Sequence, residues 1–168
     1  MGYVHDTHTS QWIPPTMVYG DTAAWAMAAG QVSGSIVYGC DATDEVANLV
    51  IPIIAPSNSV ALKGALLKSI EIDYQIVTAA CDAVTPTIVK MTRGIEGAVV
   101  VVDAAVAFSQ TPTAANSKSA DQHKLELTLT TPVWIDNDEY YYVKIAFDKA
   151  ATSTVEFLGA VANFTLRF

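Results

Sequence analysis

The sequence predicts an all-β chain, folded as an antiparallel β-sandwich of the jelly-roll kind with about eight or nine strands. Three observations support this: apolar and polar residues alternate in short runs, turn-forming residues separate the runs, and no helical periodicity lasts more than a turn or two. Alternation is typical of half-buried strands, because successive side chains point to opposite faces of a sheet. The 168 residues fit one domain, which we divide into an irregular N-terminal arm (residues 1–20) and a single β-sandwich domain (residues 21–168).

The N-terminal arm shows no sustained periodicity, and the pair Pro14–Pro15 excludes a regular helix or a central strand there. Its aromatic residues need a surface to pack on, which is either their own domain or a neighbouring subunit.

The next two short runs, 23–28 and 33–38, predict a hairpin. Residues 46–55 are almost continuously apolar, which fits a strand buried on both faces or a covered edge, and Pro52 favours an edge or a bulge.

The clearest strand in the middle of the chain spans residues 66–78. One face is apolar and the other polar: Ile70, Ile72, Tyr74 and Ile76 alternate with Glu71, Asp73 and Gln75. Further strands are expected at 87–92, 98–108 and 124–130, and residues 109–120 read as a polar surface loop. The strongest alternation is at the end of the chain, where runs 139–147 and 155–168 predict a long hairpin whose last residue lies in the core.

Composition limits the classes of partner. Hydrophobic residues make up 51% of the chain and charged residues 15%, so part of the surface is expected to be covered by other subunits. A net charge of −8 argues against nucleic acid, because phosphate binding needs clustered Lys and Arg. No apolar run reaches the ~20 residues that a membrane helix needs. No signal peptide is recognisable, so we expect synthesis inside a cell. Cys40 and Cys81 lie outside any metal-binding pattern, and either free thiols or a disulfide would fit them.

The residues that could carry chemistry are few. There is no nucleophile motif and no phosphate-binding loop, so we predict a non-enzymatic protein without a cofactor. His5 and His8 could begin a metal site or belong to a solvated arm. Asp136 and Asp138 offer oxygen ligands of the kind calcium prefers, or an ordinary turn. Glu71 and Asp73 could be a glycosidase-like carboxylate pair or a solvated strand face.

Three segments carry a resemblance: the aromatic arm, the strand 69–78, and residues 134–168 with their Trp-Ile-Asp-Asn-Asp-Glu-Tyr motif. In architecture and composition the chain resembles virion structural proteins of tailed bacteriophages, in particular capsid decoration (cement) proteins. The resemblance implies a trimer or other symmetric homo-oligomer, bound to a major capsid protein on the capsid surface after assembly in the host cytoplasm. We expect the interface residues to be aromatic or apolar: Tyr3, Trp12, Ile13, Tyr19, Tyr140 and Tyr142.

Other functions remain open. A carbohydrate- or receptor-binding β-sandwich, such as a tail-fibre head, would use Tyr140, Tyr142 or Trp134 to stack against its ligand. A minor or major capsid jelly roll is a further alternative. A metal-dependent enzyme of the cupin type would need a cluster of histidines inside the barrel, and the chain has only three.

Overall fold

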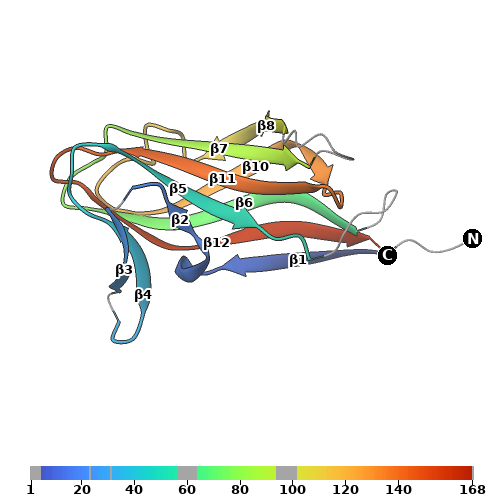
Figure 1. The fold of residues 1–168 in the computed structure, drawn as a ribbon, viewed down its shortest axis with the longest axis horizontal. Helices are drawn as coiled ribbons and strands as arrows, with labels where there is room; N and C mark the ends of the chain where they lie inside the picture. The colour runs from blue at the N-terminus through green and yellow to red at the C-terminus, as the bar shows by residue number, and fades with distance from the viewer. Residues whose placement is uncertain (1–4, 23, 31, 57–63, 94–101, 168) are drawn as a thin grey trace, which may run out of the picture.

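In the computed structural model, two antiparallel sheets pack face to face (Figure 1). The structure describes residues 5–22, 24–30, 32–56, 64–93 and 102–167. Sheet A has seven strands: β3 (Trp25–Ala29), β4 (Ile36–Cys40), β12 (Thr154–Arg167), β6 (Gly64–Val77), β10 (Gln122–Trp134), β9 (Phe108–Thr111) and β1 (Asp6–Ile13). Sheet B has five: β2 (Tyr19–Gly20), β5 (Val46–Ile53), β11 (Glu139–Asp148), β7 (Ala83–Thr92) and β8 (Val102–Val106). The predicted all-β sandwich is therefore confirmed.

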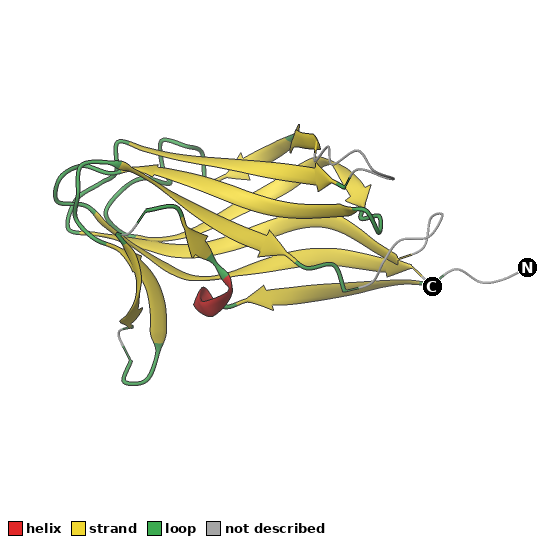
Figure 2. Cartoon of the chain, in the orientation of Figure 1, coloured by secondary structure: helices red, strands yellow, loops and turns green. Residues whose placement is uncertain are grey.

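Strands account for nearly all of the regular structure in the described residues (Figure 2). The short 3₁₀ helix η1 (Pro15–Met17) lies between β1 and β2. No described segment forms a helix long and apolar enough to cross a membrane.

The core lies between the facing sides of the two sheets. The predicted alternation along β6 is confirmed, because Ile70, Ile72 and Tyr74 are fully buried while Glu71, Asp73 and Gln75 lie on the outer face. Phe147 of β11 reaches across from sheet B, with ring centroids 5.4 Å from Tyr74 and 6.1 Å from Trp25. Edge-on aromatic contacts of this kind add to the burial of apolar area.

The predicted C-terminal hairpin is wrong. β11 belongs to sheet B, where it pairs with β5 and β7, whereas β12 belongs to sheet A, where it pairs with β6, β4 and β1. The connection between them crosses from one sheet to the other, and both Lys149 and Ser153 are fully buried there. Alternation specifies which face of a strand is apolar, but it does not specify the partner strand.

The N-terminal arm also differs from the prediction of irregular structure. Residues Asp6–Ile13 form β1, which lies alongside β12 with Asp6 opposite Arg167 and Ile13 opposite Ala160 (Figure 1). Most of the strand has polar residues on both faces, so it shows no amphipathic pattern. It is held by pairing with β12 near the far end of the chain and by the buried Ile13 at its own end. Pro14 and Pro15 follow it and end the regular pairing.

Several boundaries shift. The predicted first hairpin is β3–β4, which projects from the body of the sandwich (Figure 1). Pro52 lies near the open end of β5, opposite Tyr142 of β11 and beyond the short β2, as its missing N–H requires. Part of the predicted loop 109–120 is β9, and part of the predicted strand 98–108 lies outside the described residues.

Cys40 and Cys81 are buried free thiols, and burial raises the pKa of Cys81 to about 11.

Candidate functional site

An exposed tryptophan lies on the outer face of sheet A. Trp12 is 54% exposed, whereas its neighbour Ile13 is fully buried, as alternation along β1 requires. Trp12 lies opposite Val161 of β12, so the indole is held at the side of a well-packed central strand. A large aromatic side chain held on a rigid sheet and left half in solvent is a common feature of binding surfaces.

Gly159 provides the surface beneath this indole. The pairing of β12 with β6 is interrupted between Phe157 and Gly159, which leaves Leu158 as an extra residue. A Cβ atom on Gly159 would lie 2.3 Å from Cη2 of Trp12 and 2.5 Å from Cζ2, and the glycine has a φ of +153°. Only glycine allows the ring to lie directly on the backbone at this point.

A groove runs from Trp12 across the outer face of sheet A towards the β3–β4 hairpin. Its larger part, a hollow of about 440 Å³, is lined by Trp12, Asp73, Gln122, His123, Lys124 and Leu158. A second hollow of about 250 Å³ continues it to the hairpin and is lined by Gly30, Val32, Ser35, Ile36, Val37, Gln75, Gln122, Glu156 and Leu158. Gln122 and Leu158 border both hollows, so the two hollows lie side by side on this face of the sheet.

Polar contacts across four strands fix the side of the groove next to β1. Ser10 Oγ donates to Asn163 Oδ1 at 2.7 Å, and Asn163 Nδ2 donates to Glu71 Oε1 at 3.1 Å. Lys124 forms an ion pair with Glu71, and the hydrogen bond from Lys124 lowers the pKa of the Glu71 carboxyl. The chain of contacts joins β1, β12, β6 and β10, and it holds β1, and with it Trp12, against the sheet.

The floor of the groove holds donors and acceptors. Asp73 is half-buried, and burial raises the pKa of its carboxyl group. Gln122 Nε2 donates to Gln75 Oε1 at 3.3 Å, which orients the two amides side by side. An aromatic face beside a carboxylate, two amides and an ammonium group suits a ligand with an apolar face and several hydroxyl groups.

The residues predicted as an interface do not form one cluster. Tyr3 lies outside the described residues, and Ile13 belongs to the chain's own core, where it is unavailable to a neighbour. Tyr19 is 66% exposed on β2, and Tyr140 is 44% exposed, with Tyr142 half-buried, on the outer face of sheet B. Their predicted role in subunit contacts stays a prediction.

The aromatic residues predicted to stack on a ligand lie away from the groove. Tyr140 and Tyr142 are on the other sheet, and Trp134 is half-buried with the Arg167 guanidinium 5.1 Å from its ring centroid. The sequence pattern places Trp12 in an irregular arm, so it does not reveal the part of Trp12 in the groove. Gly159 is the residue that could have indicated it, because a glycine inside a strand pattern marks a bulge or a close approach by another group.

The candidate metal ligands, for which the sequence also allowed a turn or a solvated arm, do not come together. Asp136 is exposed in a turn, where its Oδ1 accepts a hydrogen bond from the Asn137 N–H at 3.2 Å, and Asp138 is half-buried. His5 is exposed at the start of the described chain, and Nδ1 of the exposed His8 lies 3.3 Å from Thr165 Oγ1. The turn interpretation therefore accounts for the acidic segment, and β1 pairing accounts for the position of His8.

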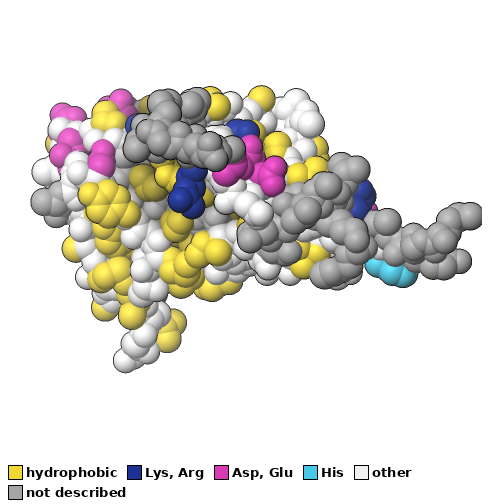
Figure 3. All heavy atoms as spheres, turned by 45° about the vertical axis from the view of Figure 1, so that its right-hand side comes forward, with side chains coloured by type: hydrophobic (Ala, Val, Ile, Leu, Met, Phe, Trp, Pro, Cys, Tyr) yellow, Lys and Arg dark blue, Asp and Glu magenta, His cyan; other side chains and the backbone are white. Residues whose placement is uncertain are grey.

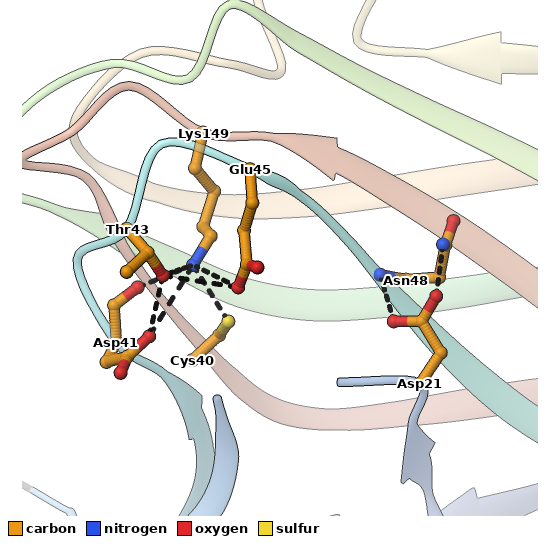
Figure 4. Close-up of polar contacts among 7 residues, drawn as sticks. All are labelled: Asp21, Cys40, Asp41, Thr43, Glu45, Asn48 and Lys149. Atoms are coloured by element: carbon orange, nitrogen blue, oxygen red, sulfur yellow. Dashed lines mark hydrogen bonds and ion pairs between the residues drawn. The ribbon is translucent and has the colours of Figure 1, made fainter. Parts of the chain in front are cut away.

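Over the described residues, one group of three potential metal ligands does come together: Cys40, Asp41 and Glu45, with ligand atoms within 4.8 Å of one another. The Lys149 ammonium group occupies this cluster (Figure 4). Nζ of Lys149 lies 3.0 Å from Cys40 Sγ and 2.5 Å from the Asp41 carbonyl oxygen, with Glu45 Oε1 at 3.7 Å. The lysine supplies the positive charge that balances the carboxylates, and it closes the end of the sandwich where the chain crosses between sheets.

Replacing Lys149 with methionine is expected to lower the free energy of unfolding by about 1–3 kcal/mol, because the buried Cys40 thiol and the part-buried Asp41 carbonyl lose their donor. The measurement is urea unfolding followed by circular dichroism. The matched control is Lys144→Met, at an exposed position of β11, which should stay within about 0.5 kcal/mol of the native chain. Equal losses for the two variants would contradict the structural role of Lys149.

Comparison with known proteins gives likeness in structure only. No protein-family model matches the chain, and no curated protein is similar to it in sequence. TmCBM61 in complex with β-1,4-galactotriose is 9% identical over 90% of this chain and 87% of that chain, with a TM-score of 0.42. The CBM22-1–GH10 modules of a Clostridium thermocellum xylanase 10B, complexed with xylohexaose, are 5% identical over 92% of this chain and 27% of that chain. The TM-score of that comparison is 0.46.

A third similar structure is the family 11 carbohydrate-binding module from Clostridium thermocellum, in complex with a β-1,3-1,4-mixed-linked tetrasaccharide. It is 11% identical over 97% of this chain and 87% of that chain, with a TM-score of 0.32. Likeness at this level does not bear on what this chain binds.

The expected identity as a bacteriophage virion protein is wrong. The three similar structures named above contain carbohydrate-binding modules, and none of them is a bacteriophage capsid protein. The features that suggested a virion protein, namely few charges and many short apolar strands, are shared by β-sandwiches of other functions and do not distinguish between them.

Proposed function

We propose that this chain is a non-catalytic carbohydrate-binding domain, and that the groove on the outer face of sheet A holds the glycan. The observation that carries the proposal is the Trp12 indole, 54% exposed beside a hollow of about 440 Å³. A pyranose ring presents an apolar C–H face that packs flat on an indole, and its equatorial hydroxyl groups point outward from that face. The likeness to known modules adds nothing to this argument.

The polar residues of the groove suit those hydroxyl groups. Asp73 can accept hydrogen bonds, Lys124 can donate them, and the amides of Gln75 and Gln122 can do both. All four lie on the outer faces of β6 and β10, and the sheet fixes their spacing. A site on a sheet is preorganised, so little entropy is lost when the ligand binds.

The groove is open and shallow, which sets the expected strength of binding. One aromatic contact with a few exposed hydrogen bonds corresponds to a dissociation constant between about 1 μM and 1 mM. A second hollow lies next to the first, on the side of the hairpin, so a chain of several sugar units should bind more tightly than a single sugar.

The experiment is native affinity electrophoresis in gels that contain neutral polysaccharides. The panel begins with β-1,4-galactan, xylan and mixed-linkage glucan, and extends to cellulose-, mannan- and starch-type polymers. We expect at least one polymer to retard the chain, and we expect Tyr140→Ala, on the other sheet, to be retarded equally. A folded chain that migrates freely through every polymer would refute the proposal.

A further inference from the structure

The outer edge of sheet A is formed by β3, a strand without the features that normally prevent edge pairing. β3 pairs with β4 alone in the described residues, and Ala26, Met27, Ala28 and Ala29 are all exposed. The strand contains no charge and no proline, which are the residues that natural edge strands use against pairing with other chains. Elsewhere such residues are present: the edge strand β8 carries Asp103, and Pro52 lies on the part of β5 that extends beyond the short β2.

The position of β3 makes it accessible. The β3–β4 hairpin leaves the body of the sandwich (Figure 1), and hydrophobic side chains are visible on this projecting part (Figure 3). Met27 is 47% exposed, and Ala24, Ala26 and Ala28 line a shallow hollow with Gly39 and Thr154. Small side chains let a second strand approach closely.

Hydrogen bonding shows which backbone groups are open. The Gly30 N–H donates to Ser35 O at 2.9 Å, and the Asp41 N–H donates to Ala24 O at 3.4 Å. Bonded and non-bonded pairs alternate along an antiparallel ladder, so the even-numbered residues of β3 direct their backbone groups to β4. Trp25, Met27 and Ala29 therefore direct theirs to the open edge, where the Trp25 N–H already donates to Thr22 O at 3.3 Å.

We propose that β3 pairs antiparallel with β3 of a second copy of this chain, about a two-fold axis at Met27. In this register Met27 faces its own counterpart and Trp25 faces Ala29. The Met27 N–H and carbonyl of each copy then meet those of the other, and the Ala29 N–H meets the Trp25 carbonyl. The row is self-complementary, as a two-fold interface requires. The chain has a net charge of −8, but none of the five residues of β3 is charged, so no like charges face each other across this pairing.

The pairing is expected to be weak, because five residues on each side bury less area than a standard interface of roughly 1,600 Å². Sedimentation equilibrium should therefore show a mass that rises with concentration from the monomer value of 17.9 kDa towards twice that value. Met27→Lys places two like charges opposite each other and should keep the monomer mass at every concentration. Val46→Lys, an exposed site on sheet B, makes the same charge change and should behave as the native chain.

The register is tested by cross-linking. Two Met27→Cys residues would have Cα atoms about 5.5 Å apart, within the range of a disulfide, whereas two Ala29→Cys residues would be about 14 Å apart. Mild oxidation should therefore give a covalent dimer of the first variant and leave the second monomeric. Equal cross-linking of the two, a native chain that stays monomeric at every concentration, or unchanged association of Met27→Lys would each overturn the proposal.

Discussion

Replacing Trp12 with alanine is expected to weaken glycan binding by roughly ten- to a hundredfold, which corresponds to the ~1–3 kcal/mol typical of aromatic stacking. The reason is that the indole supplies the apolar surface of the groove, and no other described aromatic residue lines its larger hollow except His123. Stability should change little, because half of the side chain is already in solvent. Isothermal titration with the glycan identified by affinity electrophoresis measures the loss.

Two further variants separate stacking from general damage. Tyr19→Ala removes an aromatic side chain that is 66% exposed on sheet B and should leave affinity unchanged. Gly159→Ala keeps the indole but places a methyl group 2.3 Å from Cη2 of Trp12, which tilts the ring off the backbone and should weaken binding as well. If Gly159→Ala bound normally while remaining folded, the close contact of Trp12 with the backbone would have no part in recognition.

Phe147→Ala is expected to lower the free energy of unfolding by about 3–5 kcal/mol, the usual cost of removing a buried aromatic side chain. Phe147 is fully buried and contacts the rings of Tyr74 and Trp25, so it joins the two sheets at the centre of the core. Chemical denaturation followed by circular dichroism gives the value.

The matched control lies on the same strand. Tyr140→Ala also removes an aromatic ring from β11, but that ring is 44% exposed on the outer face, and the expected loss is below about 1 kcal/mol. A Phe147→Ala variant as stable as the control would mean that the two sheets do not share this core.

The sequence predicts the strands with strong alternation well, and it predicts their pairing poorly. The faces of β6 and β11 follow directly from the positions of Ile72 and Ile145. Alternation carries no information about partners, so β11 and β12 were expected to form a hairpin although they belong to different sheets. Lys149 lies in the crossover between them, and its polar contacts come from Cys40 and Asp41 in a distant part of the chain, which its own segment does not indicate.

The candidate site was missed for the same reason. Its residues come from both ends and the middle of the chain, and only the register of β1 on β12 brings Trp12 to Gly159. Glu71 and Asp73 were recognised as a polar strand face, but nothing in their own segment indicates that a tryptophan lies beside them. Composition favoured subunit interfaces because it measures how apolar the surface is, and it cannot distinguish a ligand groove from an interface.

The most direct measurement is a ¹H–¹⁵N NMR titration with an oligosaccharide of the polymer that retards the chain. Binding in the groove should shift the Trp12 indole N–H and the amides of Asp73, Gln122 and Lys124 on sheet A, and leave Tyr140 and Tyr142 on sheet B unchanged. Shifts confined to sheet B, with Trp12 unaffected, would contradict the assignment of the groove as the binding site.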